Sequence, residues 1–294
     1  FAASVKNNTA TYGATGTSSV AIGRLAKASG TDAVAYGAQT VASGNFSSAL
    51  GLAAQATGSY GIAIGFNTLA SGALTATAIG ANSSGGGSLA SGNGSVALGG
   101  STSSGLGSFS AGQSTIASGS NSYALGFGAT ASGINSVALG GRNANADIYG
   151  KIAFGGYFTG YQSGLFTLVS DTIDATPEAL TTNNSAAGTT NQIVLPNNSA
   201  YGFTGTLIAR EDSASTNDFA VWEIKGGAVR GATAATTSLG TYNINKISES
   251  AGAANWSIAL SADTTNGAVA ITVTGEAAHN IRWVATINTA EVIY

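Results

Sequence analysis

Short runs that alternate small and large apolar residues recur through the first half of the chain. Val20-Ala-Ile22 and Val137-Ala-Leu139 are two of them, each preceded by Ser and followed by Gly. The full unit is fourteen residues long and reads Ser-x-Ala-x-Gly-x-x-x-x-Ala-Ser-Gly-x-x, with Ser122 to Asn135 as a clean copy. Alternation with a period of two is typical of β-strands. The pattern therefore predicts a repetitive all-β structure.

Nine copies and one degenerate first copy can be aligned over residues 1–149. The fifth column is glycine throughout: Gly23, Gly37, Gly51, Gly65, Gly80, Gly99, Gly112, Gly126 and Gly140. The twelfth column is glycine in most copies, from Gly30 to Gly133. Two such columns indicate two positions per unit at which the backbone needs glycine. Each is either a turn with positive φ or a position where another segment approaches the backbone closely. A helical repeat is excluded, because each glycine would cost about 1 kcal/mol in a helix. Two short strands and two turns describe one coil of a β-solenoid.

The third and fourth columns differ in size. Alanine dominates the third column, as in Ala97, whereas the fourth holds bulky residues such as Tyr36 and Leu125. Neighbouring residues of a strand point to opposite faces. The small face can fill the inside of the coil, but so thin a coil cannot hide the large face as well. We therefore expect the large face to meet another chain, in a rod on the order of 45 Å long.

The segments Ser19-Val-Ala-Ile-Gly23 and Ser136-Val-Ala-Leu-Gly140 carry a family resemblance. Together with the fourteen-residue period, they resemble the head repeats of trimeric autotransporter adhesins of the YadA type, over roughly residues 5–149. The resemblance implies a left-handed parallel β-roll in which three chains pack about a threefold axis. It implies a scaffold and names no ligand. Neither coiled-coil heptads nor membrane-anchor strands follow the repeats, unlike in that family.

The composition changes at Asp147-Ile-Tyr-Gly150, which predicts a second domain over residues 150–294. Its alternating runs and turn signals predict an antiparallel β-sandwich or jelly roll. Asn266-Gly267 between two alternating runs predicts a hairpin. The expected strands are Leu165–Ser170, Gln192–Leu195, Ala200–Glu211, Phe219–Lys225, Tyr242–Ser248, Trp256–Ala262, Ala268–Thr274 and Ile281–Tyr294. A repetitive shaft that carries a compact β domain also resembles bacteriophage tail fibres and receptor-binding proteins, which are trimeric and recognise host surfaces.

Charge and reactive residues narrow the possible functions. No Asp, Glu, Lys or Arg occurs between Ala33 and Gly141, and the net charge of −3 argues against nucleic-acid binding. No apolar run approaches the ~20 residues of a spanning helix, so no membrane insertion is expected. The chain has no Cys and one His, His279, and we find no metal or cofactor motif. The pairs Asp171/Asp174 and Glu211/Asp212 fit capping or solvation better than glycoside hydrolysis. We expect neither catalytic residues nor a cofactor.

Aromatic residues are the best candidates for binding, because carbohydrate sites combine flat apolar faces with polar groups. Tyr157 and Tyr161, at the start of the second domain, and Trp222 are the candidate receptor-binding residues. The alternatives are junction packing for the tyrosines and the sandwich core for Trp222. We expect a homotrimeric, non-enzymatic fibre that attaches to a cell-surface receptor, a glycan or a protein, and that is part of a phage virion. There are two alternatives: a bacterial surface adhesin that binds host matrix, and a polysaccharide depolymerase.

Overall fold

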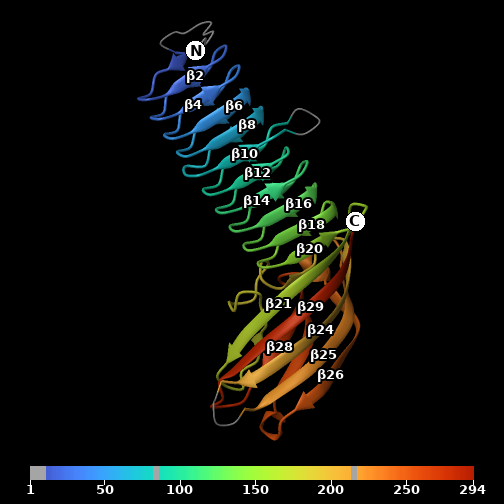
Figure 1. Ribbon diagram of the computed structural model, residues 1–294. Coiled ribbons are helices and arrows are strands. Elements are labelled where there is room, and N and C mark those ends of the chain that lie inside the picture. Colours follow the sequence, from blue (N-terminus) through green and yellow to red (C-terminus); the bar gives the residue numbers. More distant parts are fainter. Residues whose placement is uncertain (1–10, 82–85, 213–216) are drawn as a thin grey trace. The chain divides into compact units, whose positions relative to one another are not determined.

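The computed structural model describes residues 11–81, 86–212 and 217–294. The chain divides into two compact units, Phe1–Asn145 and Ala146–Tyr294, which are described separately below (Figure 1). In the described ranges, β-strands are joined by turns and by two short 3-10 helices, Ala234–Thr236 and Ala251–Ala253, without an α-helix. None of these elements is a helix long and apolar enough to cross a membrane. The predicted all-β class is confirmed.

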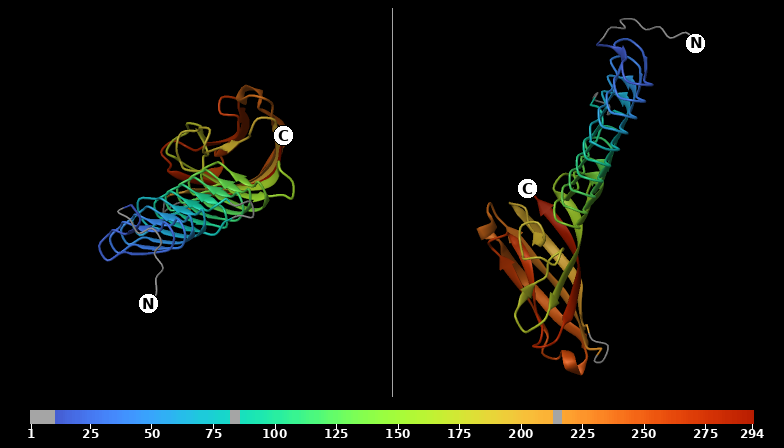
Figure 2. Two further views of the ribbon diagram at one scale, coloured as in Figure 1. Left: turned by 90° about the horizontal axis from the view of Figure 1, so that it is seen from above. Right: turned by 90° about the vertical axis from the view of Figure 1, so that its left-hand side faces the viewer.

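The N-terminal unit, called the repeat unit below, is a β-solenoid in which each coil contributes one strand to each of two parallel sheets (Figure 2). Ala21 pairs with Ala35 and Ala35 with Ala49, so each coil lies in register on the next. One sheet contains β1 (Gly13–Ala14), β3 (Lys27–Ala28), β5 (Val41–Ala42), β7 (Gln55–Ala56), β9 (Leu69–Ala70), β11 (Leu89–Ala90), β13 (Thr102–Ser103), β15 (Ile116–Ala117), β17 (Thr130–Ala131) and β19 (Asn145–Ala146). The other contains β2 (Val20–Ile22), β4 (Val34–Tyr36), β6 (Ser48–Leu52), β8 (Ile62–Phe66), β10 (Thr77–Ile79), β12 (Val96–Leu98), β14 (Phe109–Ala111), β16 (Tyr123–Phe127) and β18 (Val137–Arg142).

The inside of the solenoid is filled by methyl-sized side chains. Ala35, Ala63, Ala97 and Ala124 of the third column are 0% exposed. In the coil where serine replaces alanine, the hydroxyls bond to one another, with Ser103 Oγ 3.0 Å from Ser110 Oγ. Such bonding removes the cost of burying a lone hydroxyl. The small-residue face therefore fills the coil interior, as the sequence predicts.

The two glycine columns have different physical reasons. In the fifth column the backbone is left-handed, with φ of 130° at both Gly23 and Gly37. In the twelfth column a Cβ on Gly30 would lie 2.0 Å from the carbonyl oxygen of Gly44 in the next coil. Further left-handed residues, such as Phe46 with φ of 55°, are not glycine and were not expected from the sequence. The left-handed conformation costs about 1–2 kcal/mol at each such residue. At Phe46, the ring stacks on that of Tyr60, with 5.1 Å between the ring centroids.

The C-terminal unit is a sandwich of two antiparallel sheets. The large sheet has the order β20-β21-β29-β24-β25-β26 within this unit, and β28 of the small sheet pairs with β22, β23 and β27. The large sheet contains β20 (Ile152–Gly155), β21 (Tyr161–Thr172), β24 (Ser199–Glu211), β25 (Phe219–Arg230), β26 (Ser238–Glu249) and β29 (Ile281–Ile293). The small sheet contains β22 (Glu178–Ala179), β23 (Ile193–Val194), β27 (Ser257–Asp263) and β28 (Ala268–Thr274). The predicted sandwich is confirmed, and β20 and the short β22 lie outside the eight expected strand ranges.

A buried ion pair lies at one end of the large sheet. Lys151 Nζ is 3.0 Å from Glu291 Oε2, and both residues are at most 2% exposed. Gln162 and Thr289 donate further hydrogen bonds to the same carboxylate, at 2.5 and 2.6 Å. Burial, together with the negative charge of Glu291, raises the pKa of the Tyr201 hydroxyl well above its ordinary range. The phenol therefore stays neutral beside the pair.

We expect Ala97→Glu to destabilise the repeat unit by about 3 kcal/mol or more, because the new charge would enter a packed interior with no partner. Thermal melting followed by far-ultraviolet circular dichroism measures the loss. Gln39→Glu is the control, because it adds the same charge at an exposed turn residue and should leave the melting temperature almost unchanged. Equal melting temperatures for the two variants would contradict the assignment of the interior.

We expect Glu291→Gln to destabilise the C-terminal unit by about 3 kcal/mol, because it leaves the ammonium of Lys151 buried without a counter-charge. All three Trp lie in this unit, so denaturant unfolding followed by Trp fluorescence reports on it directly. The double variant Lys151→Met/Glu291→Leu should recover much of the loss. A double variant as unstable as the single one would show that the pair does not act as a unit.

Candidate functional site

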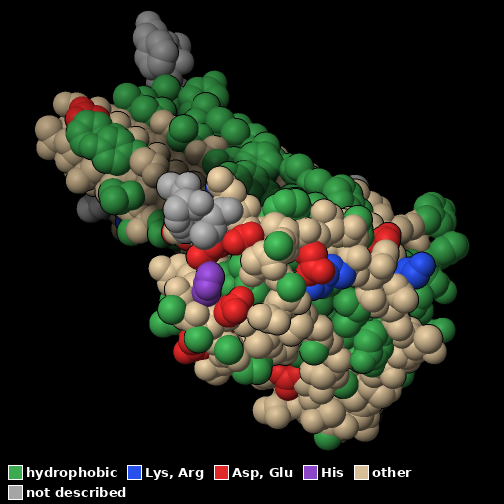
Figure 3. Space-filling model, turned by 90° about the horizontal axis from the view of Figure 1, so that it is seen from below, with side chains coloured by type: hydrophobic (Ala, Val, Ile, Leu, Met, Phe, Trp, Pro, Cys, Tyr) green, Lys and Arg blue, Asp and Glu red, His purple; other side chains and the backbone are tan. Residues whose placement is uncertain are grey.

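The large residues of the repeat unit form a ladder on its outside. We call the second- and fourth-column side chains the apolar ladder. Tyr36 is 57% exposed, Tyr123 48% and Ile64 37%. Figure 3 shows hydrophobic side chains following one another along the repeat unit. A continuous apolar surface of this kind marks an interaction site.

The predicted tyrosines lie at one short exposed loop, Tyr157 within it and Tyr161 at the start of β21. The amide of Gly156 donates to the carbonyl of Tyr161 at 2.7 Å and so closes the loop. Tyr157 is 81% exposed and Tyr161 52%. The ring of Tyr157 meets that of Phe158 edge to face at 4.8 Å. The loop therefore offers aromatic surface but not one flat platform.

Trp222 lies in the core of the sandwich. It is 2% exposed, and its ring stacks on Trp283 at 5.6 Å with an angle of 28° between the planes. Trp283 in turn contacts Trp256. The structure thus puts Trp222 where the core alternative expects it, and its ring is not accessible to a receptor.

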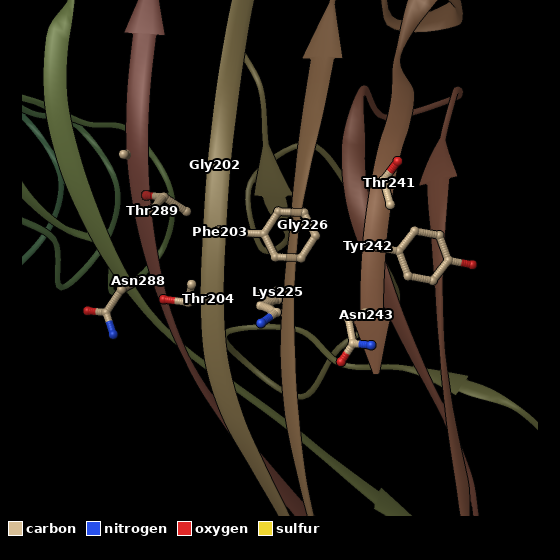
Figure 4. Close-up of a pocket in the computed structure, with 11 residues that line it drawn as sticks. Gly202, Phe203, Thr204, Lys225, Gly226, Thr241, Tyr242, Asn243, Asn288 and Thr289 are labelled. Carbon is tan, nitrogen blue, oxygen red and sulfur yellow. The ribbon is translucent and has the colours of Figure 1, made fainter. Parts of the chain in front are cut away.

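An open hollow of about 760 Å³ lies on the large sheet, over β24, β25, β26 and β29. Sequence reasoning did not identify it. We call it the sheet hollow. Its lining includes one row of polar side chains that crosses four neighbouring strands (Figure 4). The row consists of Asn288, Thr204, Lys225 and Asn243, which are paired in register from strand to strand.

At Gly202 and Ala290 the lining of the sheet hollow has no large side chain, whereas Phe203 and Tyr242 line it elsewhere (Figure 4). Gly202 pairs with Ala290 on one side and with Gly227 on the other. A β-bulge follows in the pairing of β25 with β26, next to Gly227. Bulges are common beside binding sites, because they redirect side chains. The only sign of this hollow in the sequence is glycine within long segments of alternating strand pattern.

A second hollow of about 470 Å³ continues the first and shares Gly202 and Ala290 with it. Its lining includes Ala200, Val229 and Val292, which form a second row in register across three strands. The two hollows together make a trough with one polar and one apolar wall. Along β24 the walls are four residues apart, or about 13 Å.

Among the described residues of this unit, no acidic side chain is part of the lining of the sheet hollow. Glu211 pairs with His279 at 2.9 Å, and Asp212 with Arg282 at 2.9 Å. Asp174 accepts a hydrogen bond from the amide of Thr176, which lowers the pKa of this carboxyl. Within the described ranges, no group of His, Asp and Glu side chains could hold a metal ion.

Comparisons with known proteins identify the repeats. The family model of the YadA head domain repeat matches residues 14–40, 42–68, 56–83, 83–102 and 117–143. The expected resemblance is confirmed, because these parts of the N-terminal unit match the YadA head domain repeat. A search of curated proteins gave no match.

Among solved structures, the chain is similar to two phage tailspike proteins. The tailspike of Acinetobacter baumannii bacteriophage Fri1, a capsular polysaccharide depolymerase, aligns at 8% identity with a TM-score of 0.31, over 98% of this chain and 43% of that one. The tailspike of Acinetobacter baumannii phage AM24 aligns at 11% identity with a TM-score of 0.22, over 94% of this chain and 58% of that one. The chain spans about half the length of these structures.

Proposed function

We propose that the chain is a homotrimeric, non-enzymatic fibre that presents its C-terminal unit for attachment to a glycan on a cell surface, as part of a phage tail fibre. The observation that carries the attachment role is the trough on the large sheet. It combines a polar and an apolar wall, as carbohydrate sites do. The bacterial adhesin head is the second candidate, and the match to YadA head repeats favours it.

The apolar ladder supports the trimer. Large side chains on the ladder stay in water in a single chain, although burial of each would contribute about 1.5–3 kcal/mol. Copies that pack ladder against ladder around an axis parallel to the solenoid remove this surface from water along its whole length. A closed ring of copies leaves no ladder free, which prevents open-ended association. Three copies is the number that the YadA-type resemblance implies.

The nearly charge-free repeat unit supports a presenting role. A surface without Asp, Glu, Lys or Arg from Ala33 to Gly141 offers no electrostatic attraction to charged macromolecules. Binding then depends on the C-terminal unit. The exposed loop with Tyr157 and Tyr161 is a second contact surface for a receptor in this proposal.

Light scattering of the purified chain should give three times the 28.6 kDa chain mass. Ile64→Glu, on the apolar ladder, should lower the mass, because a charge on each copy would be buried at the contact. Leu106→Glu is the matched control, because Leu106 is 59% exposed and lies outside the ladder columns. A monomeric wild-type protein at micromolar concentration would overturn the trimer.

The full chain should bind bacterial surface polysaccharide without cleaving it. Periodate oxidation of the polysaccharide should abolish binding, whereas protease treatment of the cells should not. Reducing ends should not accumulate during incubation. Binding that survives periodate and is lost after protease would point to a protein receptor, and steady release of oligosaccharides would identify a depolymerase.

A further inference from the structure

Lys225 gives the sheet hollow a positive charge that is not paired with any acidic side chain of the described residues. It is the one charged residue in the lining of the hollow, and its side chain is exposed. Within the described part of the chain, Lys225 forms no ion pair. Glu223 is two residues earlier in β25 and therefore on the same face, but it is not part of the lining. A positive group thus stands in the polar wall of a hollow that lacks acidic residues.

Amide and hydroxyl groups stand beside this ammonium. Asn243 lies opposite Lys225 on β26, and Thr204 lies opposite it on β24. Asn288 follows Thr204 on β29, and all four side chains are exposed. Amides both donate and accept hydrogen bonds, and a hydroxyl does the same. Such a row can bind the hydroxyl groups along one edge of a sugar, with Lys225 for an anionic substituent.

The floor of the hollow is kept open at positions where the fold does not require glycine. A Cβ added to Gly202 would have no atom within 4 Å, and the backbone there is not left-handed. By contrast, a Cβ on Gly205 of the same strand would lie 2.4 Å from Ile287. Glycine inside a strand costs roughly 0.5–1 kcal/mol relative to alanine, a cost that amounts to about a two- to fivefold change in an equilibrium constant. The packing of this chain therefore does not explain why residue 202 is glycine. Close approach of a ligand explains it.

The position of the hollow distinguishes a glycan from a peptide. An extended peptide binds a sheet at a free edge, where backbone groups lack partners. Under the hollow, β24 is hydrogen-bonded to β25 on one side and to β29 on the other. Over β24, a ligand can contact only side chains and the apolar floor, and the free edge of the sheet lies farther out, at β26. A sugar ring, with hydroxyls at its edge and an apolar face, matches these walls.

We propose that the sheet hollow binds an acidic sugar residue of a glycan, with its carboxylate at Lys225 and its hydroxyls at Asn243, Thr204 and Asn288. The apolar face of the glycan lies toward Ala200 and Val229. This inference rests on the proposed function, and it adds the site and the charge of the ligand. Attraction between an ammonium and a carboxylate weakens with salt, so affinity falls as ionic strength rises.

The experiment uses the full chain on an array of uronate- and sialate-bearing oligosaccharides, each printed beside its carboxyl-reduced counterpart. The wild type should bind acidic members at least about tenfold better than their reduced partners. Lys225→Gln should lose this preference. Gly202→Val should lose binding to both forms, because its side chain enters the hollow. Its melting temperature should not fall, since nothing opposes a Cβ there.

Glu223→Gln is the matched control, because it changes a charge on the same face of the same strand outside the lining. It should bind the acidic glycans as tightly as the wild type. If Gly202→Val fails to fold, Gly202→Ala and Lys225→Gln still test the site.

The outcomes separate the inference from the proposed function. Equal binding of acidic and reduced glycans would overturn the acidic ligand, and unchanged binding by Lys225→Gln and Gly202→Val would overturn the site. In both cases glycan attachment itself stands. Absence of binding to any member of the array and to whole-cell polysaccharide would overturn both.

Discussion

The close approach of one coil to the next is the constraint on which the repeat unit depends. Adjacent coils lie so near one another that a Cβ at Gly44 would stand 2.0 Å from the carbonyl oxygen of Gly58. A coil of only fourteen residues also brings its two sheets close together, which leaves room inside for little more than methyl and hydroxymethyl groups. Alanine and serine therefore fill the interior, and every large apolar side chain of the unit has to lie near the surface.

The exposed ladder follows from this narrow interior. A globular domain buries its large residues in its own core, as the sandwich does with Trp222 and Trp283. A coil of fourteen residues has no core of large side chains, and its stability comes from backbone hydrogen bonds along the stack and from its packed alanines. In the proposed trimer, contact between copies would cover the large side chains that the coil itself leaves exposed.

The sequence predicted those features that recur or that follow a simple period. The coil boundaries, the buried column of Ala97 and the paired strands of the sandwich were all expected, since each rests on alternation or on repetition. The range Gln192–Leu195 was too wide for β23, whereas several strand limits were too narrow, as at β25, which extends to Arg230 rather than Lys225. Antiparallel pairing with β24 continues the strand there, although Gly226 and Gly227 weaken the local signal.

Other features could not be read from the sequence, because they depend on which strands become neighbours. The left-handed turn at Phe46 contradicts the local preference of its residue, and contact with the next coil determines it. The row of Asn288, Thr204 and Lys225 comes from three separate strands. It becomes a wall only through the register of the sheet. Trp222 was a candidate for binding with the sandwich core as its alternative, and the structure places it in a core of three Trp.

Glycine shows most clearly how the two units differ. In the repeat unit, neighbouring backbone leaves no room for a side chain at Gly30. At Gly23, the positive φ disfavours a side chain. The fold alone therefore accounts for both glycines. In the sheet, the fold accounts for Gly205 in the same way, but the space beside Gly202 is empty. In the proposed attachment role, a ligand in the sheet hollow accounts for glycine at this position. For the proposed function, we therefore expect the recognition surface on β24 and its neighbours rather than along the solenoid.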